Sequence, residues 1–233
     1  MGQAAVYVIR EATTTADTDL CARIRADVFC SERGIIPKEA MDDGRELDEY
    51  DSLDCVSFLA TDDRGLPVGT IRIIFRGGSP LPIEKRFGIS LTPTRRAAEL
   101  SRLAVCRKEN RGEAKAHLLM LGLCRAVYDV LKKEVDDAYA IMEPRLFSNL
   151  TAMGYPFIQL GDAKTFDDDP IPTIPTLLVT EAILPSLLDG ERNGNVQDLK
   201  LGSFYAKPFD GRLTLADLVS AQSDNEVRWL RSP

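Results

Sequence analysis

The sequence predicts a mixed α/β fold in which helices flank a central mixed β-sheet. Segments with the apolar pattern of strands alternate with segments of helical periodicity, in the order β-α-β-β-β-α-β-α-β-β. The chain has 233 residues, of which 44% are hydrophobic, and this is enough to bury one large core. We expect one domain over residues 1–185, with residues 186–233 as a C-terminal extension packed on it.

Local residue patterns define the elements one by one. The first helix carries an apolar stripe of Leu20, Ile24 and Val28 and is expected to end before Gly34, because glycine favours helix ends. Apolar runs on both sides of the turn at 62–65 predict a hairpin. In chain order, we expect a strand at 6–10, a helix at 17–33, strands at 55–61, 68–75 and 98–107, a helix at 112–133, a strand at 138–142, a helix at 144–153, and strands at 157–160 and 176–183.

Four segments lack a clear element of this kind. Residues 77–97 form a connection rich in glycine and proline, which is long enough to act as a flap over a site. Residues 170–175 are expected to be a loop, and residues 189–195 resemble a linker. Residues 213–221 have the pattern of an amphipathic helix.

Composition excludes several classes of protein. An apolar run of about 18 residues, as a membrane-spanning helix needs, does not occur. The N-terminus lacks the basic start and apolar block of a signal peptide, so we expect a cytoplasmic protein. Five cysteines without metal-ligand spacing indicate reduced thiols and no metal site. A net charge of −7 argues against a broad nucleic-acid surface.

The segment 98–107, AELSRLAVCR, carries two charges where a buried strand should be apolar. Strict alternation would send Glu99 and Arg102 to opposite faces of the sheet. A β-bulge would bring them to one face and would leave backbone groups free to bond an extended ligand. Conflicts of this kind between local rules are typical of functional sites. The alternative interpretation is a buried ion pair between Glu99 and Arg102.

A basic cluster follows this strand and opens the long helix. The first N–H groups of a helix have no internal partner, and such a helix start binds phosphate well. The alternative is an ordinary solvated helix start. The residues concerned are Arg107, Lys108, Arg111, Gly112, Ala114 and Lys115.

The segment 42–54 holds seven carboxylates against one arginine, Arg45. Its spacing does not match a calcium loop, which needs oxygen ligands at alternate positions and a glycine at the sixth. A solvated acidic loop is one interpretation. The other is a partly buried loop whose carboxylates pair with arginines, because Tyr50 and Leu53 interrupt the charges.

The order of elements, with a charged strand followed by R-G-x-A and a helix, resembles the GNAT superfamily of N-acyltransferases. A closer resemblance covers residues 25–102 and looks like the signature of autoinducer (acyl-homoserine-lactone) synthases. It consists of Arg25 and Phe29, Glu46, Asp48 and Asp51, Arg72 in G-T-I-R, and Glu99 and Arg102 in E-L-S-R. Those synthases carry a tryptophan six residues after the phenylalanine, where this chain has Ile35. The sequence is therefore more similar to the related long-chain N-acyl amino acid synthases.

The resemblance implies an N-acyltransferase that moves a fatty acyl group from an acyl-carrier-protein or acyl-CoA thioester to the amine of an amino acid. No permanently bound cofactor is implied. Glu109, in the phosphate loop, would repel coenzyme A and favours a carrier protein, and Leu150 stands where a tyrosine often protonates the leaving thiolate. Two alternatives are an acyl-homoserine-lactone synthase and a non-catalytic acyl-thioester-binding module.

The expected roles follow from amine attack on a thioester. Glu99 would take the proton of the amine, and Arg102 would hold Glu99 in place. A backbone N–H freed by the bulge in 103–105 would stabilise the oxyanion. The acceptor cleft would be formed by Arg25, Phe29, Asp48, Asp51 and Arg72, the acyl-thioester site by Ser101, Leu103, Ala104 and Val105, and the phosphate or carrier site by the basic cluster.

Overall fold

The computed structural model describes residues 6–106, 113–194 and 199–218. Its centre is a mixed sheet with the strand order β6-β8-β5-β4-β3-β2-β1-β9, and β7 pairs with β8. The strands β4 and β5 run parallel, and the other strand pairs of the described chain are antiparallel. The predicted fold class, a mixed sheet flanked by helices, is confirmed.

The strands are β1 (Tyr7–Glu11), β2 (Cys55–Thr61), β3 (Pro67–Phe75), β4 (Ala97–Val105), β5 (Asp137–Met142), β6 (Phe157–Gln159), β7 (Lys164–Phe166), β8 (Asp169–Val179) and β9 (Arg212–Leu213). The α-helices are α1 (Thr15–Arg25), α2 (Pro82–Phe87), α3 (Glu113–Glu134), α4 (Pro144–Ala152), α5 (Ile183–Arg192) and α6 (Leu201–Ala206). A π-helical segment, η1 (Ala26–Glu32), continues α1, and 3-10 turns include η3 (Glu49–Ser52).

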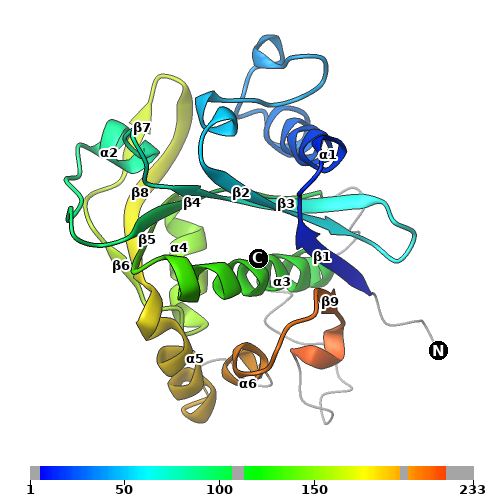
Figure 1. The fold of residues 1–233 in the computed structure, drawn as a ribbon, viewed down its shortest axis with the longest axis vertical. Helices are drawn as coiled ribbons and strands as arrows, with labels where there is room; N and C mark the ends of the chain where they lie inside the picture. Colours follow the sequence, from blue (N-terminus) through cyan, green and yellow to red (C-terminus); the bar gives the residue numbers. More distant parts are fainter. Residues whose placement is uncertain (1–5, 107–112, 195–198, 219–233) are drawn as a thin grey trace.

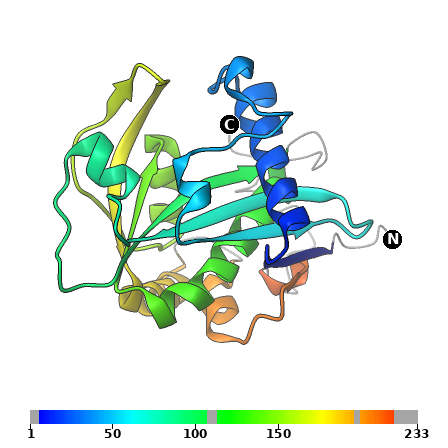
Figure 2. The same ribbon diagram turned by 45° about the horizontal axis from the view of Figure 1, so that its top comes forward.

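The helices form two layers, one on each face of the sheet (Figure 1). One face carries α1, α2 and the acidic segment, and α1 crosses the strands there (Figure 2). The other face carries α3, α5 and α6. The main core lies between the sheet and α3, whose residues Leu119, Leu121 and Leu123 are fully buried, as the apolar pattern of this helix predicted.

Several expected boundaries were wrong for physical reasons. The connection 77–97 contains a helix, α2, which begins with Pro82 and ends at Gly88 in the left-handed conformation. The expected loop 170–175 is part of β8, an extended strand that contains Pro170, Pro172 and Pro175. Residues 189–192 belong to α5, and residues 212–217 form β9 and a 3-10 turn where a helix was expected. The structure of these segments depends on tertiary contacts, because their own sequence patterns are weak.

The described part of the extension packs on the same core. Leu187, Leu201 and Tyr205 belong to the main hydrophobic cluster.

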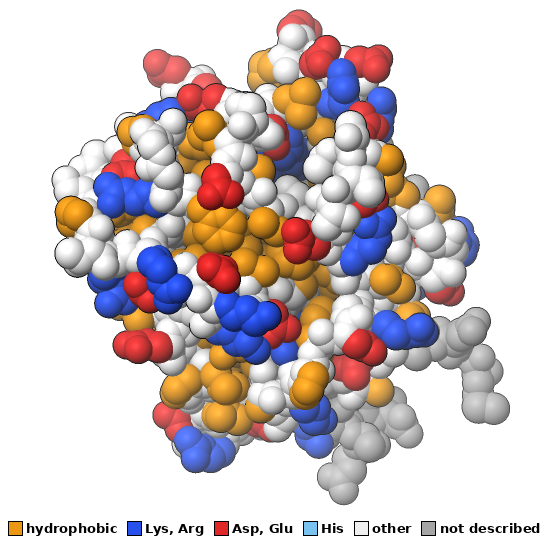
Figure 3. All heavy atoms as spheres, viewed as in Figure 1, with side chains coloured by type: hydrophobic (Ala, Val, Ile, Leu, Met, Phe, Trp, Pro, Cys, Tyr) orange, Lys and Arg blue, Asp and Glu red, His pale blue; other side chains and the backbone are white. Residues whose placement is uncertain are grey.

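A groove of about 500 Å³ lies between the strands β1 to β3 and α3, and its walls include Val56, Phe75 and Val130. Figure 3 shows apolar side chains gathered at the centre of the face seen in Figure 1, with charged side chains around them. None of the helices in the described residues has the length and apolar character needed to cross a bilayer.

We predict that Gly202→Ala destabilises the protein, because α6 meets α5 at this glycine. A β-carbon at Gly202 would lie 2.6 Å from the Cα atom of Leu188, which is backbone and cannot rotate away. Overpacking of this kind costs about 1–3 kcal/mol of unfolding free energy, which chemical denaturation would measure. Gly77→Ala is the matched control, because nothing lies within 4 Å of its new β-carbon. Equal stability of both variants would show that α5 and α6 are not packed against each other in solution.

Candidate active site

The predicted bulge lies in β4 and brings its charges to one face of the sheet. Arg72 pairs with Ser101 and Thr70 pairs with Ala104, so Ile71 alone faces both Arg102 and Leu103. Arg102 adopts a positive φ of 54°, a conformation that non-glycine residues rarely adopt. Because of this extra residue, Arg102 joins Glu99 and Ser101 on the face that carries α1 and the acidic segment.

The two parallel strands at the centre of the sheet separate close to the bulge. Pairing between β4 and β5 runs from Ala97 with Asp137 to Leu100 with Ala140. Both strands continue further, β4 to Val105 and β5 to Met142. Within the described residues, the backbone of 101–105 therefore has no β5 partner on this edge. An extended ligand can hydrogen-bond to such an edge in place of a strand.

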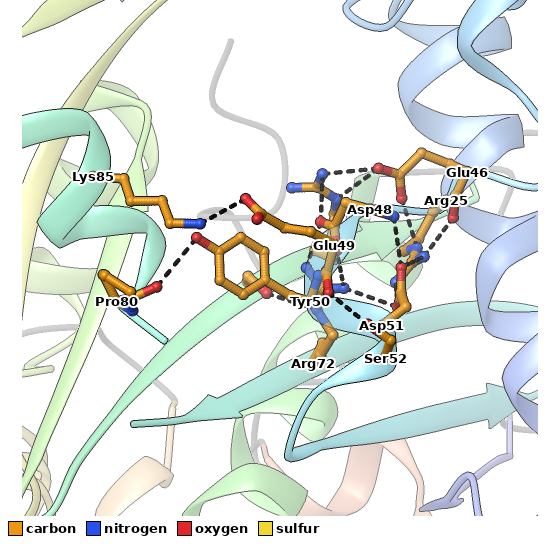
Figure 4. Close-up of polar contacts among 12 residues, drawn as sticks. Arg25, Glu46, Asp48, Glu49, Tyr50, Asp51, Ser52, Arg72, Pro80 and Lys85 are labelled. Carbon is orange, nitrogen blue, oxygen red and sulfur yellow. Dashed lines mark hydrogen bonds and ion pairs between the residues drawn. The ribbon is translucent and has the colours of Figure 1, made fainter. Parts of the chain in front are cut away.

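Three arginines and three carboxylates form a closed ring above β3 and β4 (Figure 4). Each arginine bridges two carboxylates, and each carboxylate bridges two arginines. The six ion pairs are Arg25 with Glu46 at 2.7 Å and with Asp51 at 2.7 Å, Arg72 with Asp51 at 2.8 Å and with Asp48 at 2.7 Å, and Arg102 with Asp48 at 2.9 Å and with Glu46 at 2.8 Å. We call these six residues the charge ring; its formal charges sum to zero.

The charge ring is buried on one side and partly open on the other. Arg25, Arg72 and Glu46 are almost inaccessible, whereas the Arg102 side chain is 30% exposed. Burial alone would raise the pKa of Asp51, but the hydrogen bonds and charge of Arg25, together with the charge of Arg72, lower it to about 2. The pKa of Asp48 is also lowered, because Arg72 and Arg102 outweigh the effect of burial. Both carboxylates are therefore ionised at neutral pH.

The acidic segment fixes its own geometry before it meets the arginines. In η3, the side chain of Asp48 accepts a hydrogen bond from the Tyr50 N–H, and that of Asp51 accepts one from the Asp48 N–H. The Tyr50 hydroxyl donates to the Pro80 carbonyl at 3.4 Å. Lys85 of α2 pairs with Glu49 at 2.8 Å. The segment is therefore joined to the flap that contains α2, as Figure 4 shows.

Glu99 lies beneath this flap and is only 2% exposed. Its Oε2 atom accepts a hydrogen bond of 2.8 Å from the Ile83 N–H in the first turn of α2. Desolvation by burial raises the pKa of Glu99 to about 8, although this hydrogen bond and the nearby arginines oppose the shift. The expected contact between Arg102 and Glu99 was wrong, because the acidic segment supplies Glu46 and Asp48 to Arg102 instead.

The other predicted site residues take different positions around this centre. Ser101 accepts a hydrogen bond from Arg72 at 3.1 Å, and the Phe29 ring lies 6.0 Å from the Arg102 guanidinium. Leu103 and Val105 pack against the main core, and Ala104 is buried against α1, so only its backbone can meet a ligand. Lys115 is exposed. Arg107, Lys108, Arg111 and Gly112 lie outside the described residues, as does the side chain of Ala114.

Two important residues were missing from the predicted site. Glu46 joins Arg25 to Arg102, and its place in the E-x-D-x-x-D pattern was the available signal. Tyr50 covers Arg72 with its ring and contacts the flap, and no sequence pattern indicated this role. Among the described residues, no three or more His, Cys, Asp or Glu side chains are grouped so that they could hold a metal ion.

An enclosed apolar cavity of about 30 Å³ lies on the opposite face of the sheet, at the point where β4 and β5 separate. Leu100, the last residue of β4 that pairs with β5, is one of its walls. The remaining lining residues are Ile71, Cys124, Val127, Tyr128, Leu131, Leu150, Tyr155, Phe157, Leu178, Ile183 and Tyr205. The strand separation therefore has a charged site on one face and an apolar space on the other.

A family model, described as N-acyl amino acid synthase FeeM, matches residues 21–167. This range contains the charge ring, the bulged strand and Glu99. The chain belongs to the FeeM family of N-acyl amino acid synthases. The resemblance drawn from the sequence is confirmed, and so is the expectation of an amide-forming acyltransferase.

Solved structures agree with this family in fold. FeeM, an N-acyl amino acid synthase from uncultured soil microbes, is 19% identical with a TM-score of 0.62, over 80% of this chain and 97% of that chain. BjaI, a CoA-dependent acyl-homoserine lactone synthase, is 24% identical with a TM-score of 0.62, over 81% and 90%. A putative N-acetyltransferase from Lactobacillus plantarum is 18% identical with a TM-score of 0.52, over 75% and 98%. No curated protein sequence matches the chain.

We predict that Asp51→Asn lowers the free energy of unfolding by about 3–5 kcal/mol, because it leaves Arg25 and Arg72 without a shared buried counter-charge. The folded-state pKa of about 2 lies below the ordinary aspartate pKa of 3.8. The stabilisation by Asp51 is therefore present above about pH 4 and is lost as the pH falls towards 2. Urea denaturation at several pH values would measure both effects, and the variant should lack this part of the pH dependence.

The matched control for this variant is Asp43→Asn in the same segment. The Asp43 side chain is 81% exposed, and its nearest arginine is 3.9 Å away. We expect a change of less than about 0.5 kcal/mol. If Asp51→Asn were as stable as this control, the charge ring would not contribute to the stability of the fold.

Proposed function

We propose that this protein transfers a fatty acyl group from an acyl-carrier-protein or acyl-CoA thioester to the amine of an amino acid. One observation carries the proposal: a buried carboxylate, Glu99, lies on the same strand as the open backbone edge at 101–105. Membership of the FeeM family supports it. An amine acceptor and a thioester can therefore meet at one position in the sheet.

The arm of the thioester lies along the open edge of β4 between Ser101 and Val105. Its acyl chain passes through the strand separation towards the apolar cavity, where burial of methylene groups favours binding by about 0.8 kcal/mol each. The thioester carbonyl then remains close to the bulge. A backbone N–H in 103–105 stabilises the oxyanion, an effect worth about 3 kcal/mol in other enzymes.

The acceptor approaches from the face that carries the charge ring. Glu99 takes a proton from the ammonium group, directly or through one water, so that the amine can attack the carbonyl carbon. A C–N bond forms, the tetrahedral intermediate collapses, and the C–S bond breaks. The thiolate leaves and takes up the second proton that the nitrogen loses as the neutral amide forms. The charge ring shapes the acceptor cleft, and Arg102 is its most exposed arginine.

The donor is proposed to be a carrier protein that docks on the basic cluster at 107–115. This part of the proposal comes from the sequence, in which four basic residues stand beside the expected phosphate position of an otherwise acidic protein. A local positive patch would steer the encounter of two net-negative proteins.

We expect an N-acyl amino acid when the protein is incubated with acyl-carrier protein or acyl-CoA, a mixture of amino acids and S-adenosylmethionine. Mass spectrometry of the products tests the proposal. The second candidate function is that of an acyl-homoserine-lactone synthase, since BjaI, a lactone synthase, shares the fold. Formation of an acyl-homoserine lactone would support this second function and identify S-adenosylmethionine as the acceptor. Binding of the thioester without any product would replace the proposal with a non-catalytic module.

We predict that kcat/KM rises with pH and levels off above about pH 8, because Glu99 must be ionised to act as a base and its pKa is raised to about 8. Glu99→Gln should lower kcat by about 10²-fold or more and should remove this pH dependence. Glu84→Gln is the matched control, since Glu84 lies in the same flap and pairs with Arg76 at 3.0 Å. It should keep the pH profile of the natural protein.

The pH dependence of the free energy of unfolding provides a second test of Glu99. The folded-state pKa of Glu99 is raised above the ordinary glutamate pKa of 4.5, so between these two values the folded protein holds a proton that the unfolded chain releases. The free energy of unfolding of the natural protein should therefore fall as the pH rises from about 4.5 to about 8, and Glu99→Gln should not show this fall. Retained turnover in Glu99→Gln with an unchanged pH profile would leave Glu99 with a structural role only.

A further inference from the structure

The C-terminal extension supplies part of the wall of the apolar cavity. Tyr205, on α6, lines the cavity together with Ile183 at the start of α5. The match to the FeeM family ends at residue 167, so both residues lie beyond it. The shape of this end of the cavity is therefore set in part by residues that the family match does not include.

Tyr205 meets Tyr155 at this end of the cavity. The two hydroxyl oxygens lie 2.7 Å apart and share a hydrogen bond, and the rings pack edge to face with centroids 5.9 Å apart. Both residues are buried, and burial raises the pKa of each phenol well above its ordinary value, so both stay neutral. The hydrogen-bonded pair of bulky, neutral side chains therefore forms an end wall. Because their pKa values are raised, these phenols are also poor proton donors to a thiolate.

Arg125 fixes Tyr205 in this position from α3. Its side chain is 1% exposed, and its guanidinium lies 5.4 Å from the Tyr205 ring and 5.4 Å from the Phe209 ring. Arg125 also donates a hydrogen bond of 2.7 Å to the Lys207 carbonyl. Desolvated contacts between a cation and the faces of aromatic rings are attractive. The segment that carries Tyr205 is thus held to the catalytic domain by a buried arginine.

We propose that Tyr155 and Tyr205 close the far end of the acyl-chain site, so that the C-terminal extension limits the length of the acyl group that the enzyme transfers. This inference rests on the proposed function, because it takes the cavity beneath β4 and β5 as the acyl site. The cavity has a volume of about 30 Å³, which is too small for a fatty acyl chain. An acyl chain can therefore enter only if the walls of the cavity move. Tyr155 and Tyr205 resist this movement, because they are hydrogen-bonded to each other and Arg125 packs against the Tyr205 ring.

The test compares Tyr205→Leu with the natural protein in a competition among acyl thioesters from butanoyl to hexadecanoyl. Removing the ring opens the end wall, so we expect the preferred chain to lengthen, with the ratio of kcat/KM for a longer over the original chain rising about tenfold or more. Phe204→Leu is the matched control, because Phe204 is its neighbour in α6, is buried and does not line the cavity. It should keep the chain-length profile.

Cys124→Leu gives a test in the opposite direction and does not depend on the stability of Tyr205→Leu. Cys124 lines the same cavity, and the added bulk should shift the preference to shorter chains. An unchanged profile in both variants would overturn the inference while leaving the proposed function intact. If the natural protein makes no product, the proposed function fails instead, and thermal stabilisation by the same series of acyl-pantetheines still tests the end wall: identical length profiles for the natural protein and Tyr205→Leu would overturn it.

Discussion

The charge ring is the constraint on which the site depends. Its six members come from α1, the acidic segment, β3 and β4, so one closed cycle of ion pairs joins four parts of the chain. Arg72 is 1% exposed, and burial of such a charge is tolerated only because two carboxylates meet it. The cost of removing these charges from water is offset only when each of them has its ion-pair partners, that is, when the ring is complete. A complete ring holds the acidic segment over the strands and would give the proposed acceptor cleft a fixed wall.

The bulge in β4 makes the ring compatible with a strand that, as we propose, also binds the thioester. Without the extra residue, Arg102 would point to the α3 face and the ring could not close. The bulge places Arg102 at a positive φ, which is a strained backbone conformation. Such strain persists where surrounding contacts stabilise it, and here these contacts include the ion pairs with Glu46 and Asp48. The same distortion lies next to the point where β5 leaves β4. One irregularity thus provides a shared face for Glu99 and Arg102 beside an open backbone edge.

The two faces of the sheet divide the task between charge and burial. The face with α1 and α2 holds Glu99 and the charge ring, whereas the face with α3 holds an apolar cavity closed by Tyr155 and Tyr205. A thioester with a fatty chain has the same division, since its carbonyl is polar and its tail is not. The separation of β4 from β5 is where the two faces meet, and both the flap and the C-terminal extension contact this region from outside the sheet.

Whereas it left the acidic segment as either solvated or paired with arginines, the sequence by itself determined the fold class and the conflict in the strand around Glu99 and Arg102. These features are local, because strand alternation and the spacing of charges along the chain are enough to reveal them. Only the tertiary structure decided the partners: Arg102 bonds Glu46, 56 residues away, and Tyr205 meets Tyr155, 50 residues away. Contacts at such separations depend on the paths of the connecting segments, which weak local patterns do not specify.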